Sequence, residues 1–170
     1  MIFRTIKEMF IQRGYTNVED TKTSITAIKQ DGDKICAFKT VFSKFDMDDF
    51  RNCVGTIQNT NISHVVVVFD EITPAAKGLL TRTADLRLAA GDDKFQMESF
   101  FSKTLKFNLT KHRLYCPHEK IPANEAVKIM DKYQAIKITD PVVHFFGWKK
   151  GDLIKITRKT GIPAYRIVKK

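Results

Sequence analysis

"DPVVHFFGWKKGDLIKITRKTG", residues 140–161, begins with a short segment that has helix signals at both ends and a basic patch where the helix should stop. Asp140 followed by Pro141 is typical of a helix N-terminus, where an acidic cap precedes a proline in the first turn. Gly147 stands where a C-terminal cap belongs. The short helix then runs into Lys149, Lys150 and Gly151, a basic exit that could grip a phosphate backbone, dock on a protein or turn a corner.

The segment that follows alternates as two strands. "DLIKIT" (152–157) and "AYRIV" (164–168) flank "RKTGIP", which predicts a β-hairpin. Alternation places Tyr165 on the same face as Ile167 and Arg166 on the opposite face. We therefore expect Tyr165 to pack and Arg166 to be available for docking.

The net charge of +10 lies entirely in the last part of the chain. Residues 1–105 contain 14 Lys/Arg and 14 Asp/Glu, whereas residues 106–170 contain 15 Lys/Arg and 5 Asp/Glu. Such a basic segment favours an acidic partner, either nucleic acid or an acidic protein surface, although a solvated basic face fits the same composition. Phe145, Phe146 and Trp148 could stack on bases, but helix packing explains their spacing too.

Helical and strand patterns alternate over the first 105 residues. The patterns first predict a helix that ends before Gly14, then strands at 23–29 and 34–42 joined by a turn at Asp31-Gly32. A helix through Phe50 and Ile57, with Asp46 or Asp48 near its start, leads to a buried central strand at 63–71. After it we expect a helix over 74–80 capped by Thr73, an exposed turn within 82–93, a helix near 94–102 and a strand at 105–109. This alternation indicates an α/β domain.

The remainder predicts a small α+β domain, with a helix at 122–133, the capped helix after Asp140 and the hairpin. We place the boundary so that the domains are 1–108 and 109–170. A segment of about 60 residues buries only a modest core, so we expect it to depend on a partner surface or on the first domain.

A metal-dependent nuclease is one candidate function for the first domain. Such enzymes commonly place an acid on one strand and an acid-x-Lys triplet on the next, which hold magnesium beside a lysine. "CAFK" (36–39) supplies Lys39 but has Ala37 where the second acid is required. The sequence therefore predicts a nuclease-like shape with no active site.

Other catalytic patterns are incomplete. Asp70 and Glu71 end a strand as a magnesium ligand would, but no phosphate-binding G-x-x-x-x-G-K-[ST] loop occurs. Cys116 and His118 form only half of a metal site. We expect no catalytic residue, metal, cofactor or small-molecule substrate.

Cysteine spacing and hydropathy indicate the compartment in which the chain is expected and whether it associates with a membrane. The widely spaced Cys36, Cys53 and Cys116 suit reduced thiols in an intracellular compartment. No apolar run approaches membrane-spanning length and the first residues lack signal-peptide features, so no membrane partner is expected.

The C-terminal motif closely resembles that of the fifth subunit of eukaryotic nuclear RNA polymerases and is similar to the corresponding small subunit of archaeal RNA polymerase. The family pattern falls on Asp140, Pro141, Val142, Gly147, Lys149, Lys150, Gly151, Ile154, Lys155, Ile156, Arg158, Tyr165 and Arg166. "KHRLYCPHEKI" (111–121) resembles a further family segment around Pro117 and His118. "FRTIKEMFIQRGY" (3–15) and "ITPAAKGLL" (72–80) resemble an N-terminal domain that the archaeal subunit lacks, which indicates the eukaryotic type.

This resemblance implies a two-domain, non-catalytic subunit of a DNA-directed RNA polymerase. Its N-terminal jaw domain would lie near downstream DNA through Thr73, Pro74, Ala75, Ala76 and Lys77. Its C-terminal assembly domain would dock on the largest subunit through Pro117, His118, Asp140, Pro141, Gly147, Lys149, Lys150, Gly151, Lys155, Arg158, Tyr165 and Arg166.

The chain departs from the family pattern in places: Ala75 replaces a serine, the loop at 159–163 is shorter and "QAIKI" (134–138) replaces a Leu-Pro. A reduced copy of this kind would suit a large DNA virus that encodes its own polymerase. The family implies a nuclear location, and a viral origin would imply a cytoplasmic factory or the virion. A free, basic nucleic-acid-binding protein remains the alternative function.

Overall fold

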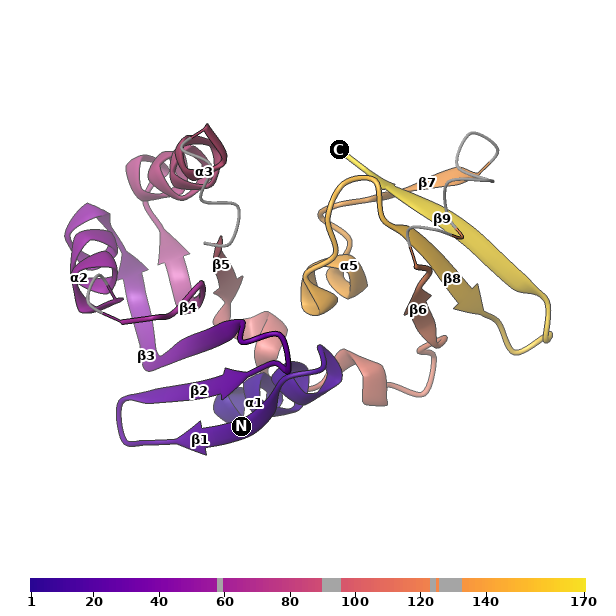
Figure 1. Ribbon diagram of the computed structural model, residues 1–170, viewed down its shortest axis with the longest axis horizontal. Coiled ribbons are helices and arrows are strands. Elements are labelled where there is room, and N and C mark those ends of the chain that lie inside the picture. The colour runs from indigo at the N-terminus through magenta and orange to yellow at the C-terminus, as the bar shows by residue number, and fades with distance from the viewer. Residues whose placement is uncertain (58–59, 90–95, 123–124, 126–132) are drawn as a thin grey trace. The chain divides into compact units, whose positions relative to one another are not determined.

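The computed structural model describes residues 1–57, 60–89, 96–122, 125 and 133–170 (Figure 1). The chain divides into two compact units, Met1–Phe107 and Asn108–Lys170, which we call the N-terminal and C-terminal units. This division falls one residue before the boundary that we place between residues 108 and 109. Each unit has its own β-sheet.

The N-terminal unit is built on a five-stranded sheet in the order β1-β2-β3-β4-β5. The strands are β1 Thr16–Asp20, β2 Ser24–Ile28, β3 Lys34–Phe45, β4 His64–Ile72 and β5 Gln96–Phe101. The first three strands are antiparallel, as the Asp31-Gly32 turn predicts, and β3, β4 and β5 are mutually parallel. Gly32 adopts φ 87°, a value that glycine supplies at little cost in such a turn.

Three helices, α1 Ile2–Gln12, α2 Met47–Ile57 and α3 Pro74–Ala89, pack on this sheet. The predicted caps of α2 and α3 are confirmed. The Asp46 carboxylate accepts hydrogen bonds from the backbone N–H groups of Asp48 (2.9 Å) and Asp49 (3.0 Å). The Thr73 hydroxyl accepts one from the N–H of Ala76 at 3.3 Å.

The central strand β4 is buried on both faces, as its apolar run predicts. Val65, Val67 and Phe69 join a core cluster with residues of α2 and with Ala76 of α3. Val66 and Val68 point to the other face of the sheet, because successive side chains of a strand alternate. On α1, which contacts β2 and β3, the side chains of Ile6, Met9 and Phe10 are fully buried.

The predicted helix near 94–102 is wrong, because residues 96–101 form strand β5. This strand pairs with β4 along its length, and its alternation buries Glu98 and Phe100. Pairing with a buried strand has overridden the local helical pattern. The predicted strand at 105–109 is also wrong: 3₁₀ helix η1 (Ser102–Leu105) and the second 3₁₀ helix η2 (Leu109–Lys111) occupy this region.

Two further features of the N-terminal unit differ from expectation. Strand β1 was not predicted, because "TNVED" does not alternate and its register with β2 is irregular between Thr16 and Glu19. In the polar stretch 82–93, for which we predict an exposed turn at "AAGDD" (89–93), helix α3 continues to Ala89. The rest of that segment lies outside the described residues.

The C-terminal unit contains a four-stranded sheet in the order β6-β8-β9-β7. The strands are β6 His118–Lys120, β7 Gln134–Lys137, β8 Leu153–Thr157 and β9 Pro163–Lys169. The predicted hairpin is confirmed as the antiparallel pair β8–β9. Strands β6 and β7, of three and four residues, were not predicted. The helix predicted at 122–133 falls almost entirely outside the described residues.

Helix α5, Pro141–Phe146, covers part of this sheet. Its Val143 forms a core with Ile154 of β8 and Val168 of β9, and all three side chains are fully buried. Ile136, Trp148 and Ile156 are partly buried and pack against this cluster. Among the described residues of the chain, no helix is long and apolar enough to cross a membrane.

Candidate functional site

The capped helix of the C-terminal unit forms as its sequence predicts. The Asp140 carboxylate accepts hydrogen bonds from the N–H groups of Val142 (2.8 Å) and Val143 (3.4 Å), and Pro141 occupies the first turn. Gly147 ends the helix with φ 67° and ψ 28°, a left-handed conformation that other residues adopt only at a cost. Asp140, Pro141 and Gly147 therefore act locally, by setting where α5 starts and stops.

The turn after α5 displays two lysines. Asp152 anchors this turn, because its Oδ2 accepts a hydrogen bond from the backbone N–H of Lys149 at 2.8 Å. Its Oδ1 lies 2.9 Å from the ammonium of Lys120. Gly151 has φ 93°, which lets the chain reverse into β8. Lys149 and Lys150 are exposed at this turn.

Four partly exposed aromatic side chains lie next to these lysines, each ring near the next. We call them the aromatic row: Tyr115, His118, Trp148 and Phe146. Phe146 stacks on Trp148 with ring centroids 4.6 Å apart and an interplanar angle of 9°. His118 lies 6.4 Å from Trp148, and Tyr115 stacks on His118 at 5.5 Å. Phe145, by contrast, is buried, as expected for helix packing.

Backbone contacts hold the Tyr115 end of the row in place. The Nδ1 of His118 lies 2.5 Å from the carbonyl oxygen of Cys116, and the carbonyl of Pro117 accepts a hydrogen bond from the N–H of Thr157 at 2.9 Å. Burial raises the pKa of the Tyr115 phenol. Of the predicted docking residues, His118 thus belongs to the row, and Pro117 connects it to strand β8.

The remaining predicted docking residues lie on the hairpin. Lys155 of β8 pairs with Tyr165 of β9, and its ammonium lies 3.8 Å from a carboxylate oxygen of Glu119. Tyr165 is partly buried and stacks on Tyr133 at 5.2 Å. Arg166 donates a hydrogen bond to the carbonyl of Tyr165 at 2.9 Å. Arg158 is exposed at the end of β8, so the predicted set is spread over two parts of this unit.

The predicted DNA-proximal residues lie together at the start of α3. Pro74, Ala75 and Lys77 are exposed, and Thr73 is partly exposed. The Ala76 side chain is fully buried in the core cluster. The Ala76 side chain therefore packs α3 onto the core, and it is not exposed to a partner.

The nuclease-like position in the hairpin holds an ion-pair cluster. Ala37 is fully buried, and Lys39 pairs with the carboxylate of Asp20, which also pairs with Lys7 of α1. Hydrogen bonds from Lys39 and then Lys7 lower the pKa of Asp20. Within the described part of the chain, no three His, Cys, Asp or Glu side chains gather so that they could hold a metal ion.

A buried polar network in the N-terminal unit was not predicted. Arg13 makes two hydrogen bonds to Glu98, at 3.2 and 2.8 Å, and Glu98 lies 3.0 Å from Nε2 of His64. Nδ1 of His64 is 3.3 Å from the hydroxyl of Tyr15, which donates to Asp33 at 2.9 Å. These residues are far apart in the sequence, so no local pattern could reveal the network.

The charges of this network are mutually compensating. Burial opposes ionisation of Glu98, but the Arg13 charge and the hydrogen bond from His64 hold the pKa of Glu98 well below its usual range. Burial, followed by the hydrogen bond to Asp33, raises the pKa of Tyr15. The network therefore ties α1 to the edge of the sheet at which β3, β4 and β5 begin.

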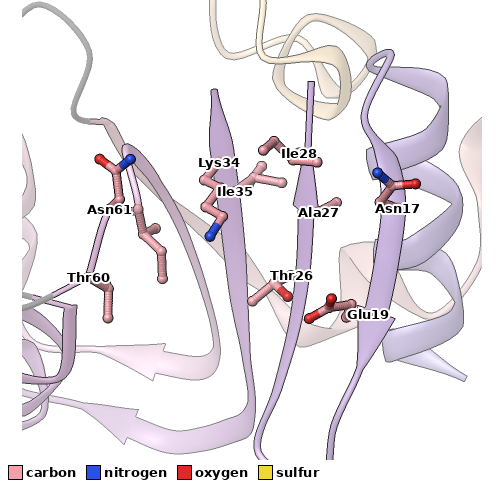
Figure 2. Close-up of a pocket in the computed structure, with 10 residues that line it drawn as sticks. Asn17, Glu19, Thr26, Ala27, Ile28, Lys34, Ile35, Thr60 and Asn61 are labelled. Carbon is pink, nitrogen blue, oxygen red and sulfur yellow. The ribbon is translucent and has the colours of Figure 1, made fainter. Parts of the chain in front are cut away.

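An open hollow of about 460 Å³ lies against β1, β2 and β3, bounded by residues 60–62 (Figure 2). Its charged lining residues are Glu19 and Lys34, one of each sign. Figure 2 shows them on separate strands, with Thr26 and Ile28 between. This pairing offers no set of acids, bases or nucleophiles that would define an active site.

Comparison with known proteins identifies a domain in the C-terminal unit. Residues 107–168 match the family model described as RNA polymerase Rpb5, C-terminal domain. The matched residues begin within one residue of the C-terminal unit, which starts at Asn108.

Relatives extend the similarity beyond that domain. The chain is 26% identical, over 98% of its length and 97% of the relative, to a protein of Invertebrate iridescent virus 6 whose name assigns it to DNA-directed RNA polymerase as subunit 454R. It is 26% identical over 74% of its length to the Caenorhabditis elegans subunit RPABC1 of DNA-directed RNA polymerases I, II and III. The Dictyostelium discoideum subunit of that name is 24% identical over 74% of the chain. The matches span 60% of the nematode subunit and 65% of the Dictyostelium one.

The domain match and the nearly full-length viral relative agree with the resemblance carried by the C-terminal motif. Residues 107–168 are thus similar to the C-terminal domain of RNA polymerase Rpb5, and nearly the whole chain is similar to a viral protein named as a DNA-directed RNA polymerase subunit.

Proposed function

We propose that this chain is a non-catalytic subunit of a multisubunit DNA-directed RNA polymerase. Its C-terminal domain (109–170) docks on the largest subunit, and its N-terminal jaw domain (1–108) lies near downstream DNA during transcription. The observation that carries the proposal is the coincidence of the Rpb5 C-terminal domain match, at 107–168, with the unit that holds the basic excess.

Docking through the C-terminal domain is supported by the small size of its core. Among its described residues, six hydrophobic side chains are buried: Val143, Phe145, Leu153, Ile154, Ile167 and Val168. A unit of this size gains much of its stability from a partner surface. Its exposed lysines and aromatic row supply the charge and the aromatic area that interfaces favour.

A non-catalytic role is supported by what occupies the nuclease-like position. Ala37 replaces a metal-binding carboxylate, and Lys39 is held in an ion pair with Asp20. A magnesium site would need further oxygen ligands there.

The start of α3 is the segment that we assign to downstream DNA. Backbone N–H groups at a helix N-terminus and the helix dipole favour phosphate, and exposed Lys77 adds a positive charge one turn in. The N-terminal part has no net charge, so this contact is weak alone. It matters when the largest subunit holds the duplex nearby and raises the effective concentration.

The partners under this proposal are the largest subunit, other polymerase subunits and downstream DNA. The relatives include a viral protein and subunits of RNA polymerases I, II and III. Under this proposal the chain acts in the nucleus or, if it is viral, in a cytoplasmic factory or the virion.

Affinity purification from the native source tests the proposal. Tagged full-length chain should bring down the largest polymerase subunit, and deletion of 109–170 should abolish this recovery. Deletion of 1–105 should leave it detectable. Recovery by the N-terminal part alone would overturn the assignment of docking to the C-terminal domain.

The excess of ten positive charges in residues 106–170 also favours a second candidate, a free nucleic-acid-binding protein. Such a protein would bind DNA or RNA alone, with an affinity that falls steeply as salt rises, because released counterions dominate the free energy. Binding of that kind, without polymerase recovery, would favour this candidate.

A further inference from the structure

The aromatic row is joined to the core of the C-terminal unit through Trp148. Trp148 packs against the cluster of Val143, Ile154 and Val168, and Phe146 stacks on Trp148. Trp148 and Phe146 are therefore held in place before any partner arrives, and the contact of His118 with the Cys116 carbonyl restrains the other end of the row, which reduces the entropy lost on binding. Partly exposed aromatic side chains on a rigid base are the anchors that protein interfaces use most.

The charge beside the row is positive and uncompensated in the described structure. Lys149 and Lys150 follow Trp148 directly and are exposed. Both carboxylate oxygens of the neighbouring Asp152 are engaged, one by Lys120 and one by the Lys149 backbone. Among ion pairs between described residues, none includes the Lys149 or Lys150 side chain.

The arrangement of the rings favours a protein partner over nucleic acid. Bases bind to aromatic side chains by stacking on open ring faces. In the row, Phe146 and Trp148 stack on each other, and so do Tyr115 and His118. One face of each ring is thus covered, and the ring edges and outer faces that remain suit aliphatic and aromatic side chains of a polypeptide.

We propose that the aromatic row and the Lys149–Lys150 pair form one docking surface for an acidic polypeptide segment of another polymerase subunit. Apolar side chains of that segment lie against the rings, and its carboxylates pair with the two ammonium groups. This proposal rests on the function proposed above and adds the chemistry of the partner. His118, Lys149 and Lys150 then act together with Tyr115, Phe146 and Trp148, which the family pattern does not include.

Photocrosslinking in the assembled complex tests the chemistry. A benzoylphenylalanine at position 114 replaces Leu114, which is 65% exposed and adjacent to Tyr115. Full-length tagged chain is irradiated after recovery of polymerase, and crosslinked peptides are identified by mass spectrometry. We expect a peptide from another subunit in which Asp and Glu outnumber Lys and Arg.

Charge variants distinguish binding through Lys149 and Lys150 from attraction by the overall positive charge of the unit. Lys149→Glu with Lys150→Glu should lower the crosslink yield at least about tenfold at physiological salt, because two attractions become repulsions. Lys149→Arg with Lys150→Arg should retain it. The matched control, Lys159→Glu with Lys170→Glu, reverses the same number of exposed charges in this unit and should change the yield less than about threefold. Unchanged melting of all three variants shows that folding is intact.

Each outcome decides the matter. If the wild-type chain recovers no polymerase, the proposed function fails and this inference falls with it. If polymerase is recovered, a basic or neutral crosslinked peptide, a crosslink to nucleic acid, or no crosslink overturns the inference alone. An equal loss in the control variant also overturns it, because total charge would then explain the binding.

Discussion

In the N-terminal unit Arg13 and Glu98 meet in the interior, with side chains only 4% and 6% exposed, whereas in the C-terminal unit Lys149 and Lys150 stand in solvent. The first unit balances its charges and uses several of them as internal ties. The second has 15 Lys/Arg against 5 Asp/Glu in residues 106–170 and displays the excess. Buried ion pairs fix an architecture, while exposed charges of one sign attract a partner. The contrast shows that charged side chains hold the N-terminal unit together internally, whereas in the C-terminal unit the two lysines after α5 face solvent.

Breaking the internal tie should have the largest effect on stability. Glu98→Gln leaves Arg13 buried without its charge partner and should destabilise the N-terminal unit by about 3–5 kcal/mol. Hydrogen exchange of the β4 amides measures this, because that strand lies at the centre of the unit. Arg51→Ala is the control, since its pair with Asp48 is 66% and 81% exposed and contributes about 0–1 kcal/mol. Equal effects of the two variants would contradict the contrast between buried and exposed charge.

The same carboxylate should make the N-terminal unit acid-sensitive. The folded pKa of Glu98 is depressed, so its stabilisation is complete above the unfolded-chain value of about 4.3 and is lost as pH falls through the folded value. Unfolding free energies measured across the acid range should therefore fall less steeply for Glu98→Gln than for the wild type. Parallel pH profiles would show that other carboxylates dominate acid unfolding.

A core substitution in the C-terminal unit should lower its unfolding free energy by somewhat less than Glu98→Gln does in the N-terminal unit. The small C-terminal unit is nevertheless expected to unfold. Ile154→Ala removes part of a fully buried side chain from a small core and should cost about 2–4 kcal/mol, enough to unfold a small unit. The single tryptophan, Trp148, packs on this core, so its fluorescence reports on this unit directly. Tyr165→Ala should cost less, about 1–2 kcal/mol, because Tyr165 is only partly buried. A larger loss for Tyr165→Ala would show that its stack on Tyr133 outweighs the core.

Glycine substitutions should give small changes in stability, with opposite signs in the two units. Gly147→Ala imposes φ 67° on a residue with a side chain and should destabilise the end of α5 by about 1–2 kcal/mol. Gly55→Ala, within α2 and with open space around its added methyl group, should stabilise by about 0.5–1 kcal/mol. Thermal unfolding of both variants checks the pair, and the same sign for both would contradict this account of the α5 cap.

Local chemistry is what made much of the fold predictable. Asp140 with Pro141, Thr73 with Pro74, and Asp31 with Gly32 each act through neighbours a few residues away, and each forms the predicted cap or turn. The long apolar run of β4 was likewise sufficient to indicate a buried strand.

Long-range partners decided the features that were missed. Strand β5 forms because β4 is available beside it, although its own residues suggested a helix. The short strands β6 and β7 carry too few residues for a periodic pattern. Of the candidate site, the family motif supplied Lys149, Lys150 and His118. The contact that joins the Tyr115–His118 stack to the Phe146–Trp148 stack is between His118 and Trp148, which are far apart in the sequence.

The strand order of the C-terminal unit has a kinetic consequence. Strands β8 and β9 are joined by a short turn, so their pairing requires little loop-closure entropy and should form within microseconds. Strands β6 and β7 must each come from a distant part of the segment to reach the outer edges of that hairpin, His118 to Ile156 and Gln134 to Arg166. Such non-local pairings slow folding, and the hairpin is the natural nucleus on which they condense. Substitutions within the β8–β9 pair should therefore slow folding, whereas those in β6 or β7 should chiefly speed unfolding.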